Sequence, residues 1–259
     1  MSASVFISHG SPMVALEEDA YSAALRAFGA RTRPRAVVVV SAHWTTPGDV
    51  VRVGAAERHE LLYDFGGFPE PLYRLRYPAR GDAALAADVA SRLRAAGLDA
   101  ALDPARGLDH GAWIPARIAW PDASVPLVEA SLPGLPPAGL VRMGEALRPL
   151  RDEDVLVLGS GGMVHNLREL DWADKAAPPP EWAVAFDAWM AERLAAGDRA
   201  GLLAYRERAP WARRAAPTTE HLDPLFVAVG ASGGDPLHTL HEGFHHGSLG
   251  MRSLEFRAA

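Results

Sequence analysis

The chain contains no cysteine, which excludes disulfide bonds, thiolate metal ligands and a cysteine nucleophile. Lysine is nearly absent as well, because Lys175 is the single one and lies in the loop-like stretch 174–178. Schiff-base catalysis requires a buried lysine with a lowered pKa, and this position looks exposed, so covalent lysine chemistry is disfavoured. The residue types left for catalysis are His, Asp, Glu, Ser and Tyr.

Long apolar runs and an excess of positive charge are missing too. No apolar stretch is long enough to cross a bilayer, so we expect no membrane partner. The first residues lack the basic region and apolar core of a signal peptide, and we therefore expect a cytoplasmic protein. The formal net charge of -6 argues against nucleic acid as a partner, because binding phosphates requires clustered positive charge.

The chain has 259 residues, of which 49% are hydrophobic, and this is enough for a sizeable core. Short β-rich apolar runs alternate with helical patterns. This alternation predicts an α/β fold with a single domain over 1–259, in which helices flank a central, mostly parallel or mixed β-sheet on both faces. The expected strands are 4–8, 36–42, 125–130, 155–158 and 248–257, and the expected helices are 82–96, 138–150, 182–195 and one that starts near Thr218 or Thr219.

Three histidines stand at the ends of predicted strands. His9 follows the first strand, His43 ends the second, and His165 follows strand 155–158 after a Gly-rich turn. Any one of them alone is more simply interpreted as a hydrogen-bonded loop residue. Ligands of open α/β sheets bind beyond the carboxyl ends of the strands, so we predict that the three side chains meet at one edge.

His110 lies in a polar break beside Asp109, which suits a histidine that transfers protons. An equally good interpretation is that Asp109 caps the next helix and His110 is incidental. His221 is expected to open a helix between Glu220 and Asp223, and all three are metal-ligand types. Acidic residues also favour helix N-termini on electrostatic grounds. Imidazole ligands suit Zn, Fe, Cu or Ni, and the spacing does not choose among them.

Six segments of the chain occur in the order in which a known family carries them. They are 8–13 (SHGSPM), 39–44 (VVSAHW), 63–69 (YDFGGFP), 108–113 (LDHGAW), 164–167 (VHNL) and 217–225 (PTTEHLDPL). Together they resemble the class III (LigB-type) extradiol ring-cleavage dioxygenases, in the branch of the DOPA 4,5-dioxygenases. The resemblance extends from His9 to the expected terminal strand.

The resemblance implies an α/β domain with a mononuclear non-haem metal, Fe(II) for activity and Zn(II) in the protein as purified. It implies that His9, His43 and His221 are metal ligands, that His165 is a ligand or a base next to the metal, and that His110 is the acid/base histidine. Many members of the class use two histidines and one glutamate instead. Here a histidine occupies the expected carboxylate position, and an all-histidine site also binds zinc comfortably.

The activity implied is the insertion of both atoms of O₂ into a catechol such as DOPA or caffeate, which gives a ring-opened semialdehyde. In this interpretation His165 or His110 removes a substrate proton, and His110 later returns one. Four aromatic side chains are candidates for apolar pocket walls, namely Trp44, Phe65, Phe68 and Trp113. For Phe65 and Trp113 a role in the core is at least as good an interpretation.

Two other functions fit the same residues. A zinc hydrolase would use the histidines as ligands and Glu220 or Asp223 as its base. A non-catalytic Memo-like protein would bind metal and act through protein interactions, because fold does not prove catalysis. The sequence does not fix the oligomeric state or the natural catechol, although Arg168 and Arg252 are candidates to bind a substrate carboxylate.

Overall fold

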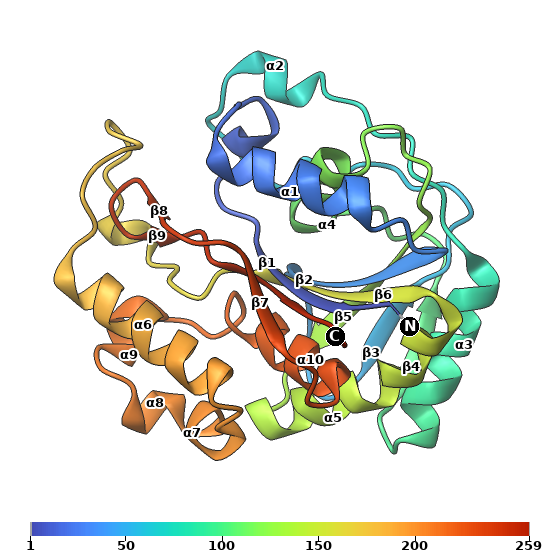
Figure 1. The fold of residues 1–259 in the computed structure, drawn as a ribbon. Coiled ribbons are helices and arrows are strands. Elements are labelled where there is room, and N and C mark those ends of the chain that lie inside the picture. Colours follow the sequence, from blue (N-terminus) through green and yellow to red (C-terminus); the bar gives the residue numbers. More distant parts are fainter. Residues whose placement is uncertain (1, 259) are drawn as a thin grey trace.

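Eight strands form one mixed sheet at the centre of the fold in the computed structural model, which describes residues 2–258 (Figure 1). The strand order is β4-β3-β5-β2-β6-β1-β10-β7. In chain order the strands are β1 (Ser4–Ser8), β2 (Ala36–Thr46), β3 (Val51–Gly54), β4 (Ala100–Asp103), β5 (Leu127–Pro133), β6 (Val155–Gly161), β7 (Leu237–His241) and β10 (Ser253–Phe256). A separate ribbon pairs β8 (Phe244–His245) with β9 (Leu249–Gly250).

The middle of the sheet is parallel. Strands β5, β2, β6 and β1 run in the same direction, and β3 runs parallel to β4. The pairs β3–β5, β1–β10 and β10–β7 are antiparallel. The α/β class with a mostly parallel or mixed sheet, predicted from the sequence, is therefore confirmed. The extent of the domain, 1–259, stays a prediction.

Helices cover both faces of the sheet (Figure 1). Helices α1 and α4 pack on one face, and α3, α5 and α10 pack on the other. The helices are α1 (Ala20–Arg31), α2 (Glu70–Tyr73), α3 (Ala83–Ala95), α4 (His110–Ala119), α5 (Pro137–Leu147), α6 (Glu181–Ala195), α7 (Arg199–Leu203), α8 (Tyr205–Arg208), α9 (Ala212–Ala215) and α10 (Asp223–Ser232). Within residues 2–258 there are also three 3₁₀ turns, η1 (Pro12–Ala15), η2 (Arg148–Glu153) and η3 (Leu167–Glu169).

Burial on both faces explains why the central strands read as continuous apolar runs. In β2, Val37 and Val39 join the core under α1 and α4, whereas Val38 and Val40 join the core on the opposite face. A strand that is covered on both sides has no polar face, so it shows no alternation of polar and apolar residues. The same pattern makes β1, β2 and β6 readable from the sequence.

The C-terminal strand is where the structure differs most clearly from the sequence prediction. The sequence predicted one strand over 248–257, but the structure divides this segment into β9 and β10. β9 pairs with β8 outside the main sheet, and β10 pairs with β1 and β7 inside it. Because the two short strands have different partners, the chain between them leaves the ladder. Among the described residues, no helix combines the length and the apolar character needed to cross a bilayer.

Candidate metal centre

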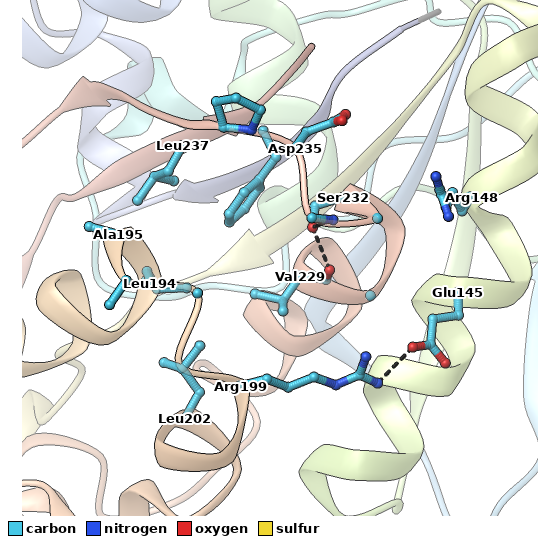
Figure 2. Close-up of a pocket in the computed structure, with 17 residues that line it drawn as sticks. Glu145, Arg148, Leu194, Ala195, Arg199, Leu202, Val229, Ser232, Asp235 and Leu237 are labelled. Carbon is cyan, nitrogen blue, oxygen red and sulfur yellow. Dashed lines mark hydrogen bonds and ion pairs between the residues drawn. The ribbon is translucent and has the colours of Figure 1, made fainter.

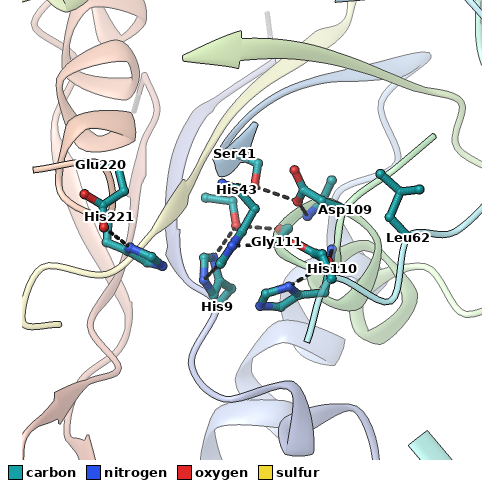
Figure 3. Close-up of polar contacts among 12 residues, drawn as sticks. His9, Ser41, His43, Leu62, Asp109, His110, Gly111, Glu220 and His221 are labelled. Atoms are coloured by element: carbon teal, nitrogen blue, oxygen red, sulfur yellow. Dashed lines mark hydrogen bonds and ion pairs between the residues drawn. The ribbon is translucent and has the colours of Figure 1, made fainter. Parts of the chain in front are cut away.

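Five histidines from separate segments converge at the carboxyl-terminal edge of the parallel strands. His9 follows β1, His43 lies in β2, His165 follows β6 after a short turn, His110 begins α4, and His221 precedes α10. The ring centroids of His43 and His110 are 4.0 Å apart, and those of His9 and His43 are 4.9 Å apart (Figure 3). The structure thus brings together all the histidines that the sequence analysis singled out.

Two of these histidines lie in elements that differ from the prediction. β2 does not end at His43 but continues to Thr46, with an irregular register against β5 around that histidine. Helix α10 begins at Asp223, with Pro224 in its first turn, so His221 precedes the helix instead of opening it. Proline favours the first turn of a helix because its missing N–H is not needed there.

Three of the histidines could hold one metal ion. One ring nitrogen from each of His9, His43 and His221 lies within 4.8 Å of the others. The Nε2 atoms of His9 and His43 are 3.1 Å apart, and Nε2 of His221 is buried without a hydrogen-bond partner. A buried polar atom without a partner is costly. Convergent imidazole nitrogens are a donor set that fits iron or zinc.

Hydrogen bonds on the far side of the rings orient two of these nitrogens. The hydroxyl of Ser160 donates to the carbonyl of Gly111 at 2.5 Å, so it accepts the hydrogen bond from Nδ1 of His9 at 3.0 Å. In His221, Nδ1 lies 3.0 Å from Oε1 of Glu220 and donates to that carboxylate (Figure 3). Both contacts place the ring proton on Nδ1 and leave Nε2 with its lone pair, as metal ligation requires.

Asp64 is a functional candidate that the sequence analysis did not assign. Its Oδ1 accepts hydrogen bonds from the backbone N–H and from Nδ1 of His110, both at 3.0 Å. Its Oδ2 lies 3.6 Å from Nδ1 of His43. Burial would raise the pKa of Asp64, but the hydrogen bonds from His110 and the neighbouring imidazoles lower it to about 2. The segment 63–69 drew attention as a motif, yet nothing local connects Asp64 to His110.

A buried hydrogen bond holds the start of α4 against β2. Oδ1 of Asp109 accepts from the hydroxyl of Ser41 at 2.7 Å and from the backbone N–H of Ala112 at 3.1 Å (Figure 3). Asp109 is therefore the N-cap of α4, as one interpretation of the sequence held. His110 is not incidental, however, because the cap and the bond to Ser41 place it directly beside His43.

The burial of the cluster favours neutral imidazoles. Burial and the neighbouring histidines together lower the pKa of His43 to about 2, although the carboxylate of Asp64 acts in the opposite direction. Burial and His221 lower the pKa of His165 to about 3, and burial also lowers the pKa of His9. Neutral imidazole is the form that binds metal ions, so the cluster is ready to ligate at neutral pH.

His165 occupies a different place from the other ligand candidates. Its ring stacks on that of His221, with centroids 3.5 Å apart and planes that differ by 7°. Its backbone N–H donates to the carbonyl of Ala215 at 2.8 Å. Among the described residues, it does not belong to the group of three whose nitrogens converge. The structure therefore places His165 beside the candidate metal site, on the wall of the cavity.

The five histidines open into a cavity of about 360 Å³. Phe65 and Phe68 line it, together with three apolar residues that the sequence analysis did not consider, Leu167, Trp172 and Leu249. Leu167 and Trp172 are 51% and 52% exposed, which identifies them as the mouth. A cavity of this size lies near the lower end of the range for small-molecule sites.

Trp44 does not line the cavity, which corrects the expectation that it forms a pocket wall. Neighbouring side chains on a strand point to opposite faces, so the orientation of His43 toward the cavity turns Trp44 away. Trp44 is buried, with the guanidinium of Arg106 5.0 Å from its ring centroid. Trp113 is part of the core, and its indole N–H donates to the carbonyl of Leu62 at 3.1 Å.

A larger cavity of about 700 Å³ lies elsewhere, between α5, α6, α7 and α10 (Figure 2). The guanidinium of Arg199 pairs with Glu145 there at 2.6 Å, and the hydroxyl of Ser232 donates to the carbonyl of Val229. None of the described residues that line it is a histidine. Size alone does not identify a site, and the smaller cavity holds the groups that can bind a metal.

Comparison with known proteins gives full-length matches. The sequence model of the family described as the catalytic LigB subunit of aromatic ring-opening dioxygenase matches residues 3–256. The chain is 35% identical over 258 residues to 4,5-DOPA dioxygenase extradiol of Beta vulgaris, which covers 97% of this chain and 95% of that protein. It is 38% identical over 258 residues to 4,5-DOPA dioxygenase extradiol of Escherichia coli (strain K12), with 97% and 93% covered.

A solved structure shares the fold. The crystal structure of an uncharacterized protein from Escherichia coli K12 has a TM-score of 0.84 and 34% sequence identity, and the match covers 99% of this chain and 100% of that one. These likenesses span the sheet and every segment that carries a histidine of the cluster. The resemblance predicted from the sequence is confirmed: the chain belongs to the LigB family of aromatic ring-opening dioxygenases and is an extradiol dioxygenase.

Proposed function

We propose that this enzyme opens the ring of a catechol with O₂, inserts both oxygen atoms and releases a ring-opened semialdehyde. We propose that His9, His43 and His221 hold a single non-haem metal, which is Fe(II) for activity and Zn(II) in the protein as purified. The observation that carries the proposal is the convergence of one nitrogen from each of these rings within 4.8 Å, beside a cavity with apolar walls.

When bound there, Fe(II) supplies the redox chemistry that couples the ring to O₂ and lowers the pKa of the catechol hydroxyls. The chain supplies the geometry around it. The contacts from Ser160 and Glu220 orient the rings of His9 and His221, and Phe65 and Phe68 form an apolar wall against which an aromatic ring can pack. A mostly apolar wall also limits the access of water.

His110 is proposed as the acid/base residue. Its Nδ1–H donates to Asp64, which fixes the tautomer and leaves Nε2 as the atom that exchanges a proton. In the proposed cycle Nε2 accepts a proton from one catechol hydroxyl and later returns it to an oxygen of the opened ring. Asp64 acts through His110 as a positioning residue, since its carboxylate favours the protonated imidazole at the intermediate stage.

His165 is proposed as a second base. It lines the cavity next to His221, and a neutral imidazole there has a ring nitrogen that can accept a proton. Its place outside the group of three supports this role over that of a fourth ligand. A catechol has two hydroxyl protons, so two proton acceptors at one cavity suit a substrate that binds as a dianion.

The test is to load the metal-free protein with Fe(II) under anaerobic conditions and then to add air and a catechol such as DOPA or caffeate. We expect O₂ uptake and a yellow ring-opened product. His110→Ala should lower kcat by about 10²–10⁴-fold, the usual contribution of a general acid/base, while metal content stays unchanged. The matched control is His238→Ala, because His238 lies on β7 and does not line the cavity.

Two results would contradict the proposal. Normal turnover by His110→Ala would remove this residue from the mechanism. Hydrolysis of an ester by the Zn(II) form, combined with no O₂ uptake by the Fe(II) form with any catechol, would favour a zinc hydrolase. Neither result is expected, because the family to which the chain belongs opens aromatic rings.

A further inference from the structure

The charges inside the cavity are unevenly distributed. Of the described residues that line it, none is lysine or arginine, and Asp64 is the one with a carboxylate. Apart from the histidines, Asp64 and Ser11, the lining consists of glycine and apolar residues, which include Pro12, Phe65, Phe68 and Leu249. Apart from the imidazoles that accept substrate protons, the lining therefore holds no cationic side chain that could pair with an anionic substituent on a bound ring.

Neither the two arginines that the sequence offered nor Lys175 lines the cavity. Arg252, which the sequence offered as a carboxylate binder, is held by Asp187 at 2.6 Å and by Glu242 at 2.9 Å. The amine of Lys175 pairs with the carboxylates of Glu17 at 2.5 Å and Asp19 at 2.6 Å. Arg168, the other arginine that the sequence offered, follows Leu167 but is exposed and does not line the cavity.

This distribution of charge should make the cavity select among ring substituents by their charge. An unpaired carboxylate loses its hydration when it is buried against apolar walls, and the cost is large unless a cation or hydrogen bonds replace the water. A second anion near Asp64 is also repelled by it. An uncharged substituent meets neither obstacle, and it gains from contact with the aromatic wall.

We propose that the cavity accepts single-ring catechols with uncharged ring substituents and rejects catechols that carry a carboxylate directly on the ring. A carboxylate is tolerated at the end of a spacer that carries it past Leu167 and Trp172 into solvent. This inference rests on the proposed function, since it assumes that the catechol hydroxyls lie at the histidine end. The substrate class is therefore set by where a charge falls along the cavity, and not by a dedicated binding residue.

The decisive comparison uses 3,4-dihydroxybenzoate and its methyl ester, because both substituents are planar carboxyl derivatives at the same ring position and only one is charged. With the Fe(II) enzyme we expect kcat/KM for the acid to be at least about tenfold below that for the ester, which corresponds to about 1.4 kcal/mol. 3-(3,4-Dihydroxyphenyl)propionate, whose carboxylate has a spacer, should fall close to 4-methylcatechol. Equal values for acid and ester, or a higher value for the acid, would overturn the inference.

A binding measurement separates this inference from the proposed function. Calorimetry of the Zn(II) form without O₂ should give a Kd order in which the ester and 4-methylcatechol bind more tightly than the acid. If the Fe(II) form consumes no catechol, the proposed function fails. The order of the Kd values in the Zn(II) form still tests whether the cavity rejects a carboxylate on the ring. Tighter binding of the acid in the Zn(II) form would overturn it.

A variant at the mouth tests the physical cause. Leu167→Arg places a cation at an exposed position and should lower the Kd of 3-(3,4-dihydroxyphenyl)propionate severalfold relative to the Kd of 4-methylcatechol in the same variant. Leu167→Gln is the matched neutral control, and Leu102→Arg places the same charge at an exposed position away from the cavity. The same gain in all three variants, or no gain in Leu167→Arg, would contradict the assigned position of the carboxylate.

Discussion

The imidazole rings of His165 and His221 stack face to face, with centroids 3.5 Å apart and planes within 7° of parallel. Stacking holds the two side chains together, although they have different places in the cluster. His221 contributes its nitrogen to the group of three, and His165 does not. This division separates the proposed metal ligands from the residues that surround them.

His165→Phe should separate binding from catalysis. Phenylalanine preserves the stacked ring but has no atom that can accept a proton. We expect the metal affinity to change by less than about threefold and kcat to fall by about 10²-fold or more. Metal titration and steady-state O₂ uptake measure the two quantities. Loss of the metal together with activity would identify His165 as a fourth ligand.

Asp64→Asn should impair the orientation of His110. An amide is nearly the same size as the carboxylate, but it does not stabilise a protonated imidazole. We expect kcat to fall by about 10–100-fold, the usual effect of removing such an outer partner, with little change in KM for 4-methylcatechol. Asp88→Asn, on the exposed side of α3, is the control. Unchanged kcat and an unchanged pH profile would show that Asp64 has no part in proton transfer.

The metal-free protein should lose stability as the solution becomes acidic. The folded-state pKa values of His43 and His165 are lowered to about 2 and about 3. Between these values and about pH 6.5, the unfolded chain therefore binds more protons than the folded protein does. Stability is therefore complete above pH 6.5 and falls as the pH decreases through this window, with a slope of up to about 1.4 kcal/mol per pH unit for each histidine.

Urea unfolding at pH 7, 6 and 5, after removal of metal, measures that slope. His165→Phe should reduce this slope by up to about 1.4 kcal/mol per pH unit, the contribution of one histidine, because phenylalanine does not titrate. Zn(II) should restore stability at pH 7, since it binds the folded state. A slope that is identical in the wild-type protein and in His165→Phe would contradict the assigned burial of this ring.

Lys175→Met should loosen the mouth of the cavity. Lys175 ties its loop to Glu17 and Asp19 at 2.5 and 2.6 Å, and the same loop carries Trp172. The ion pairs are partly exposed, so we expect a loss of about 1 kcal/mol in the free energy of unfolding. The KM for 4-methylcatechol should rise severalfold, with kcat nearly unchanged. Arg199→Met removes a comparable exposed ion pair away from the mouth and serves as control.

Lys175→Arg should recover most of the wild-type KM, because it restores the charge. An increase in KM that is equal in Lys175→Met and Arg199→Met would mean that general destabilisation, and not the position of Trp172, causes the effect.

The central strands were predictable from local patterns, and the meeting of His9, His43 and His165 was predictable once those strands were taken as parallel. β1 matches the predicted range 4–8, since an apolar, β-rich run bounded by polar residues has few other structures available. The placement of His9 and His165 follows from the topology of parallel strands alone. These features need no knowledge of how distant loops fold.

Other features depend on contacts that no local pattern reveals. Asp64 lies in a loop, and its role depends on His110, which is 46 residues away in the sequence. Trp44 was predicted to form a pocket wall. The alternation of side chains along a strand argues against that prediction, because it turns Trp44 away once His43 faces the cavity. The start of α10 was also signalled by Pro224, which marks a first helical turn.

The most direct test of the metal centre is the stoichiometry and affinity of metal binding in single-histidine variants. EDTA-treated protein is titrated with Zn(II), and separately with Fe(II) under anaerobic conditions. We predict one metal ion per chain in the wild-type protein, in His165→Phe and in the control His238→Ala. In His9→Ala, His43→Ala and His221→Ala binding should be at least about a hundredfold weaker, because the loss of an outer partner alone costs up to that much. Wild-type affinity in any of these last three variants would contradict the proposed centre.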